Sequence, residues 1–166
     1  MSAMQWSETF ENQLERMDNT HREFVDHYNR VAAALGSEGF VAAYDEFVAH
    51  TEAHFAQENR WMEAVNCPEC HRGEHDRVLT VLHDIRKRAE QGDLFFARRL
   101  IQELPAWFDN HTNGMDAALA FHLKSVGYDV DTETLAPQAA GDCGGAAAAG
   151  CACAVLSANP EPEARA

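Results

Sequence analysis

The chemistry that this chain could perform is concentrated in histidines and carboxylates that recur at helical spacing. His54 and Glu58 form one pair and His71 and His75 form another, and four positions separate the members of each pair. On an α-helix this spacing places both side chains on one face, a turn apart, so each pair can converge on one point. The remaining candidates lie upstream and downstream of these pairs: His21, His111 and Asp116. The pattern predicts a metal site.

The number and type of these side chains narrow the choice of metal. Five imidazoles and two carboxylates are too many ligands for one zinc ion, which takes four, and offer too few oxygens for calcium. They suit two iron ions bridged by carboxylates, although manganese stays open because geometry and supply choose between the two metals. Glu58 lies within an apolar stripe, where an ionised carboxylate is costly to bury without a cationic partner. A metal ion would supply that partner.

Four apolar stripes at helical spacing would position the candidate ligands. They run from Met17 to Leu35, from about Ser37 to Val65, from His71 to Ala89 and from Phe96 to Leu123. Asp18 or Asn19 and then Asp93 are the expected caps of the first and fourth helices, and Pro68 precedes the third. Gly36, Gly92 and Gly127 are the expected helix ends. Short connections then predict an all-α protein, an antiparallel up-down-up-down four-helix bundle with a cofactor site in its core.

Two irregularities are expected in the fourth helix. Pro105 should kink or break it, because proline lacks the N–H that an α-helix needs and its ring clashes with the preceding turn. His111 and Asp116 are five residues apart, one more than neighbours on an α-helix, so both face one centre only if the turn widens locally. We expect that widening at Asn113 and Gly114.

Length and composition predict one domain with additional segments at both ends. The 166 residues suffice for one domain with a proper core. Residues 1–17 show no clear period and are expected to form an N-terminal arm on a bundle that spans residues 1–130. Residues 131–166 are rich in Ala, Gly and Pro and also contain Cys, and we expect them to form a flexible tail.

Charge and hydropathy exclude several kinds of partner. A net charge of −14 opposes binding to nucleic acid and to anionic membrane surfaces. The N-terminus lacks the basic start and apolar run of a signal peptide, and no stretch is apolar for the length of a membrane span. We therefore expect a cytoplasmic protein without membrane insertion, with a monomer favoured.

The order of the candidate ligands, with Trp6 ahead of them and Trp107 four residues before His111, resembles the bacterial hemerythrin family over roughly residues 5–127. The resemblance implies two irons that are bridged by an oxide or hydroxide. By this resemblance one iron would be held by His71, His75 and His111 and the other by His21 and His54, with Glu58 and Asp116 bridging both. The second iron would keep an open position for O₂.

The resemblance also implies reversible O₂ binding that needs no protein acid or base. We therefore assign no catalytic residue and expect the protein not to be an enzyme. The protein would instead have to exclude water and stray protons with an apolar wall. The candidates for this wall are Phe24, Phe55, Trp61, Trp107 and Phe108. Aromatic residues at this spacing would belong to the core in any case.

Cys67 and Cys70 stand directly before His71 in the spacing of a c-type haem attachment motif. We reject that interpretation, because the chain shows no export signal and His71 already fits the di-iron pattern. The two residues could form a redox-active disulfide that restrains His71, or they could be reduced bystander thiols. They could also share a zinc or iron–sulfur site with Cys143, Cys151 and Cys153. Five cysteines cannot all pair within one chain, which suits a reducing compartment.

Three functions follow from these features. The first is storage, transport or delivery of O₂, with an unidentified oxygen-consuming partner. The second is an oxygen or redox sensor that uses the same site together with Cys67 and Cys70 or the tail. The third is a di-iron enzyme that acts on peroxide or nitric oxide.

Overall fold

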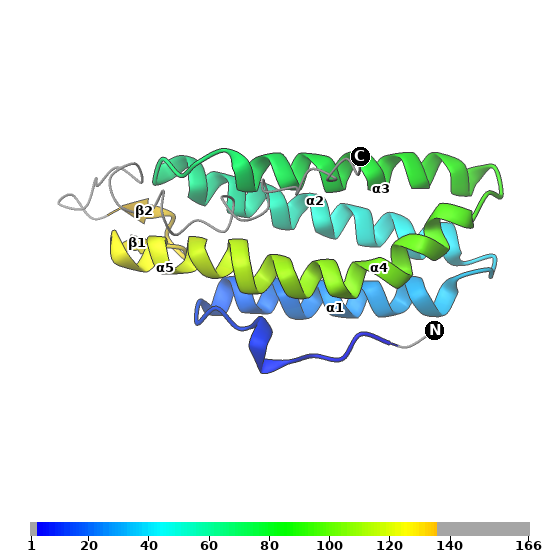
Figure 1. Ribbon diagram of the computed structural model, residues 1–166, viewed down its shortest axis with the longest axis horizontal. Coiled ribbons are helices and arrows are strands. Elements are labelled where there is room, and N and C mark those ends of the chain that lie inside the picture. Colours follow the sequence, from blue (N-terminus) through cyan, green and yellow to red (C-terminus); the bar gives the residue numbers. More distant parts are fainter. Residues whose placement is uncertain (1–2, 136–166) are drawn as a thin grey trace, which may run out of the picture.

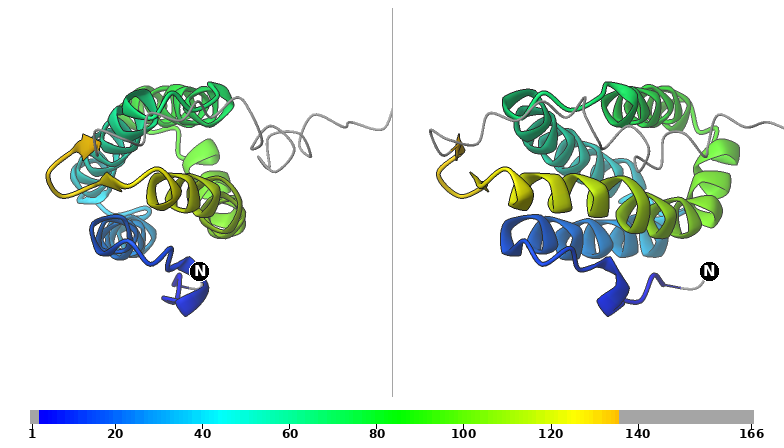
Figure 2. Two further views of the ribbon diagram at one scale, coloured as in Figure 1. Left: turned by 90° about the vertical axis from the view of Figure 1, so that its left-hand side faces the viewer. Right: turned by 60° about the vertical axis from the view of Figure 1, so that its left-hand side comes forward.

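A computed structural model describes residues 3–135, and the first two residues and residues 136–166 lie outside the described part. Four long helical segments run lengthwise beside one another (Figure 1). They are α1 (Glu15–Ala34), α2 (Phe40–Ala64), α3 (Cys70–Glu90), and α4 (Phe95–His111) with its continuation through the π-helical turn η2 (Thr112–Asp116) into α5 (Ala117–Ser125). Seen along the axis, they surround a common centre (Figure 2). The predicted all-α four-helix bundle is confirmed.

The ends of the helices follow from local chemistry. Gly36 and Gly92 follow α1 and α3 with φ angles of +84° and +80°, a left-handed conformation that glycine adopts without steric cost. The N–H of Phe95, at the start of α4, donates to Oδ1 of Asp93 over 3.0 Å. Asp93 therefore satisfies a donor at the start of the helix, but the capping position itself is occupied by Leu94 and not by Asp93 as expected.

The start of α1 differs from the expectation that Asp18 or Asn19 caps it. The helix begins at Glu15, and no side chain caps it at Leu14. The carboxylate of Asp18 instead accepts the backbone N–H of Asn12 over 2.6 Å. The cap prediction was wrong because this side chain ties the preceding arm to the helix.

The fourth helix contains both expected irregularities. Pro105 lies inside α4, which continues without a break to His111, although the first part of the helix lies at an angle to the rest (Figure 1). The turn between His111 and Asp116 is widened into a π-helix over Thr112–Asp116. The predicted widening is therefore confirmed.

An N-terminal arm, which we define as residues 3–14, runs along the outside of α1 (Figure 1). It contains a single short helix, η1 (Glu8–Phe10), and buries the side chains of Met4 and Phe10. The backbone N–H of Met4 donates to the side chain of Asn29 over 2.8 Å, and that side chain donates back to the Met4 carbonyl over 3.0 Å. These two hydrogen bonds fasten the N-terminal end of the arm to α1.

A small hairpin follows α5 where the sequence suggested the start of the tail. Strands β1 (Tyr128–Asp129) and β2 (Thr134–Leu135) pair in antiparallel fashion. In this hairpin, the carboxylate oxygen Oε1 of Glu133 lies 3.3 Å from Nη2 of Arg16 and 3.1 Å from Nη2 of Arg60. Residues 131–135 therefore belong with the bundle, because ion pairs that composition does not reveal fasten them to α1 and α2. The rest of the predicted tail lies outside the described residues.

The core divides into two apolar clusters. The larger, which we call the first cluster, contains Phe24, Tyr44, Phe47 and Leu82 among its members. The second cluster lies toward the hairpin and includes Met17, Trp61, Met62 and Leu123. None of the helices between residues 3 and 135 combines the length and apolar character that crossing a membrane requires.

The first cluster should dominate the stability of the bundle. Leu82 is fully buried there, whereas its neighbour Val81 is 50% exposed. We expect Leu82→Ala to lower the free energy of unfolding by about 2–5 kcal/mol through lost burial and a residual cavity. The matched variant Val81→Ala should change it by less than about 0.5 kcal/mol. Urea unfolding at equal metal content measures both, and equal effects would contradict this description of the core.

Candidate metal centre

The predicted ligands meet in a buried polar layer between the two apolar clusters. Every helical segment contributes to it: His21 from α1, His54 and Glu58 from α2, His71 and His75 from α3, and His111 and Asp116 from the end of α4 and η2. All seven side chains are buried, and the most accessible, His71, is only 6% exposed. On α2 this layer is flanked by Phe47 of the first cluster and Met62 of the second. The fold therefore brings together all seven residues that the sequence singled out.

These side chains form two groups that share Glu58. We call the group of Glu58, His71, His75, His111 and Asp116 the three-histidine half, and the group of His21, His54 and Glu58 the two-histidine half. In each group, one ligand atom from every residue lies within 4.8 Å of the ligand atoms of the others. The chain could accordingly hold two metal ions side by side.

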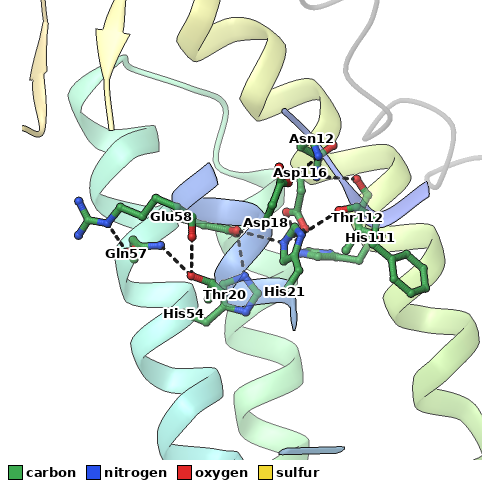
Figure 3. A network of polar contacts seen from close by, with 12 residues as sticks. Asn12, Asp18, Thr20, His21, His54, Gln57, Glu58, His111, Thr112 and Asp116 are labelled. Carbon is green, nitrogen blue, oxygen red and sulfur yellow. Dashed lines mark hydrogen bonds and ion pairs between the residues drawn. The ribbon is translucent and has the colours of Figure 1, made fainter. Parts of the chain in front are cut away.

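Asp116 directs one oxygen toward each half. Its Oδ1 lies 3.1 Å from Nε2 of His71 and 3.3 Å from Nε2 of His111. Its Oδ2 lies 3.2 Å from Nε2 of His21. Figure 3 shows Asp116 close to both His21 and His111. The carboxylate is placed as a bridge would be.

Glu58 has the same arrangement on the opposite helix. Its Oε1 lies 2.9 Å from Nε2 of His54 and 3.8 Å from Nε2 of His21. Its Oε2 lies 3.4 Å from Nε2 of His75 and 3.8 Å from Nε2 of His71. Both carboxylates therefore span the two halves.

In the three-histidine half, ring nitrogens point at one another. The Nε2 atoms of His71 and His75 lie 3.2 Å and 3.3 Å from Nε2 of His111. A neutral imidazole has a single N–H, so three inward-facing Nε2 atoms cannot all be satisfied by hydrogen bonds among themselves. A metal ion at their common centre would accept all three lone pairs.

Several atoms of this layer are buried without a hydrogen-bond partner among the described residues. They include Nε2 of His21, Oε2 of Glu58 and both carboxylate oxygens of Asp116. Buried polar atoms are normally paired, and a buried charge without a counter-charge is costly. Cations placed between the carboxylates and the imidazoles would satisfy these atoms. Imidazole and carboxylate donors suit iron, so the residues present fit such a centre.

The charges of the layer in the absence of metal follow from its contacts. Burial alone would raise the pKa of each carboxyl group, but the surrounding histidines hold the pKa values of Glu58 and Asp116 well below their usual range. Burial would lower the pKa of His21, yet Asp116 and Glu58 outweigh it and raise this pKa to about 10. Asp116 likewise raises the pKa of His111 against the effect of burial. In the metal-free protein, protons on these histidines therefore supply the positive charge that metal ions would otherwise supply.

Two of the histidines are oriented by carbonyl oxygens that were not predicted from the sequence. Nδ1 of His75 lies 3.0 Å from Oδ1 of Asn59, and Nδ1 of His21 lies 3.2 Å from the backbone oxygen of Phe10. A carbonyl oxygen only accepts, so each Nδ1 must carry the proton and donate it. Each Nε2 then keeps its lone pair for the centre.

Aromatic rings cover the three-histidine half. The ring of Phe55 stacks on His75 with centroids 3.9 Å apart, and Trp107 stacks on His111 with centroids 4.6 Å apart. The indole N–H of Trp107 donates to Glu74 over 2.9 Å, which fixes the ring in place. Both residues belong to the wall predicted from the sequence.

The two-histidine half is covered by a second aromatic pair. Phe24 and Phe108 stack with centroids 4.5 Å apart, and Phe108 meets His21 edge-on at 5.6 Å. Trp61, the fifth predicted member of the wall, lies in the second cluster instead, beneath the guanidinium of Arg16. It follows Glu58 by three positions, which carries it one turn along α2 toward the hairpin.

The two cysteines singled out in the sequence lie at the start of α3, beside the site. Cys67 precedes α3 and Cys70 begins it, directly before His71. The other residues proposed for a shared metal site, Cys143, Cys151 and Cys153, lie outside the described part of the chain.

A four-helix bundle whose core contains two groups of histidines and carboxylates, each able to hold a metal ion, is typical of a non-haem metalloprotein. Residues 12–120 match the family described as Hemerythrin HHE cation binding domain, and the chain belongs to the hemerythrin family. It is 44% identical to the bacteriohemerythrin of Ralstonia nicotianae over 138 residues, which cover 82% of this chain and 100% of that protein. The bacteriohemerythrin of Stenotrophomonas maltophilia is 28% identical over 130 residues, covering 75% of this chain and 84% of its own length. No solved structure matches significantly.

The raised pKa of His21 predicts that metal uptake competes with protons. Below a pH of about 10, His21 of the metal-free protein carries a proton that must leave before Nε2 can bind a cation. Titrating the folded, metal-free protein with Zn²⁺ at neutral pH should therefore release protons, and the apparent affinity should rise with pH. The variant His83→Ala should behave identically, because His83 lies outside the layer and pairs with Glu52. An affinity independent of pH would contradict these charges.

Proposed function

We propose that this chain binds O₂ reversibly at a non-haem di-iron centre. The observation that carries the proposal is the arrangement of the two carboxylates, in which Glu58 and Asp116 each turn one oxygen toward each half of the layer. Two buried carboxylates that each offer one oxygen to each half are suited to hold two cations close together. The family and the buried cluster of histidines and carboxylates support iron as the metal.

In this proposal the ligands divide unequally between the irons. One iron would be held by the histidines of the three-histidine half: His71, His75 and His111. The other would be held by His21 and His54, and Glu58 and Asp116 would serve both irons, together with an oxide or hydroxide. The two-histidine half would then have one protein ligand fewer, which would leave a position for O₂. When bound, the irons would supply the electrons that O₂ takes up and returns.

The surrounding side chains exclude water from that position. Phe24 and Phe108 are both at most 1% exposed, and Phe24 lies beside His54 with ring centroids 6.2 Å apart. An apolar surface here prevents water and stray protons from reaching the bound gas, which would otherwise leave the centre oxidised. No side chain is required as an acid or a base.

The names of both relatives point to a non-enzymatic oxygen-binding family. This agrees with the absence of a catalytic role for any residue in the proposal. We assign the chain to storage, transport or delivery of O₂ in the cytoplasm, as a monomer that serves an oxygen-consuming partner. An oxygen sensor built on the same site would differ in its partner and not in these ligands.

Optical spectra with and without O₂ test the proposed function. The reduced, anaerobic protein should gain visible absorption bands on addition of O₂ and lose them again on sparging. His54→Ala removes a ligand from the two-histidine half and should abolish these bands. The control His83→Ala should leave them unchanged.

Two results would contradict the proposal. A normal, reversible spectrum in His54→Ala would show that the ligands are assigned wrongly. Immediate oxidation of the wild-type protein that sparging cannot reverse would favour an enzyme.

A further inference from the structure

We propose that the N-terminal arm positions His21 through Phe10 and thereby controls the two-histidine half of the centre. The inference rests on the proposed function, since it assigns a role in holding the ligand beside the open position. Phe10 has no ligand atom of its own that faces the layer. It is therefore a positioning residue and not a metal ligand.

The first contact that carries the inference is made by the backbone of Phe10. Its carbonyl oxygen accepts a hydrogen bond from Nδ1 of His21 over 3.2 Å, and both residues are buried. The opposite ring nitrogen, Nε2, faces Asp116 at 3.2 Å. The carbonyl thus fixes both the tautomer and the rotation of a ring whose other side faces the metal position.

The second contact is made by the ring of the same residue. Phe10 meets Phe108 edge-on with centroids 5.1 Å apart, and Phe108 in turn meets His21. Phe10 therefore supports His21 directly through its carbonyl and indirectly through the aromatic wall. A shift of Phe10 would therefore remove both the hydrogen bond to His21 and the support of Phe108.

The arm depends on few attachments before Phe10. Met4 is held by the paired hydrogen bonds to Asn29. Trp6 packs against Phe10 with centroids 5.5 Å apart and lies beneath the guanidinium of Arg22 at 4.8 Å. Asn29 and Arg22 both belong to α1, so these contacts hold the start of the arm along this helix.

After Phe10 the arm is tied to the segment that carries Asp116. The side chain of Asn12 donates to the backbone oxygen of Thr112 in η2 over 3.4 Å, and Lys124 of α5 donates to the backbone oxygen of Asn12 over 2.8 Å. Figure 3 shows Asn12 beside Thr112 and Asp116. The arm thus connects the helix of His21 with the π turn that places the bridging carboxylate.

The other half of the layer is built differently. His75 takes its acceptor from Asn59, which lies within α2 and is held by the helix itself. His21 takes its acceptor from Phe10, the last residue of the short helix η1 in the N-terminal arm, outside the four long helical segments. Loosening the arm should therefore affect His21 and leave His75 unchanged. This difference separates a positioning role from a general effect on stability.

Solvent exchange of the ligand N–H groups tests the inference in the iron-loaded protein. Proton NMR with ¹⁵N-labelled histidine follows the paramagnetically shifted Nδ1–H signals of His21 and His75 after transfer to D₂O. In Asn29→Ala and in Phe10→Ala, exchange at His21 should accelerate by roughly tenfold or more, because local opening of the arm exposes the hydrogen bond. Exchange at His75 should not change.

A matched variant reverses the pattern. Asn59→Leu removes the acceptor of His75 and should accelerate exchange there without affecting His21. Phe10→Leu keeps an apolar side chain on Phe108 and should restore most of the protection that Phe10→Ala loses. Chelator challenge provides a second readout, in which Asn29→Ala should lose one iron roughly 10–100-fold faster than the wild type.

The outcomes separate the inference from the proposed function. A wild-type protein that holds no iron pair overturns both. If the protein binds two irons per chain but solvent exchange accelerates equally at His21 and His75 in the arm variants, the inference alone is overturned. The arm would then only stabilise the fold. Unchanged exchange at His21 in both arm variants overturns it as well.

Discussion

The structure depends on the burial of two carboxylates and five imidazoles in the middle of a helical bundle. Such a layer interrupts the apolar core and leaves Glu58 and Asp116 without access to water. Apolar packing on both sides of the layer must hold the helices in place. The layer itself is satisfied only when positive charge lies between the two carboxylates, as protons in the metal-free protein or as metal ions. The same electrostatic requirement therefore governs the fold and the site.

The two halves of the layer are not equivalent, and the difference follows from the elements that build them. The histidines of the three-histidine half come from α3 and the end of α4, and Phe55 and Trp107 stack on two of their rings. The two-histidine half lies between α1 and α2 and depends on the arm for the orientation of His21. In the proposed function, the half with fewer protein ligands is also the half whose histidine is oriented from outside the four long helical segments. The proposed position for O₂ would lie on this side.

Much of this could be read from the sequence, because spacing carries the information. Apolar periodicity predicted the four helices, and the five-residue step from His111 to Asp116 predicted the π turn. The acceptors of Nδ1 could not be predicted in this way. A backbone oxygen such as that of Phe10 leaves no mark on residue type, and Asn59 looks like any polar helix residue. The displacement of Trp61 likewise depends on where the ligand layer ends along α2.

The most direct test of the account is a crystal structure of the iron-loaded protein with anomalous scattering measured at the iron edge. We predict two peaks within the layer, about 3.5–4 Å apart, with Glu58 and Asp116 each contacting both. One histidine group should surround each peak, and the peak beside His21 and His54 should have fewer protein ligands. A single peak, or iron bound elsewhere, would contradict the central claim.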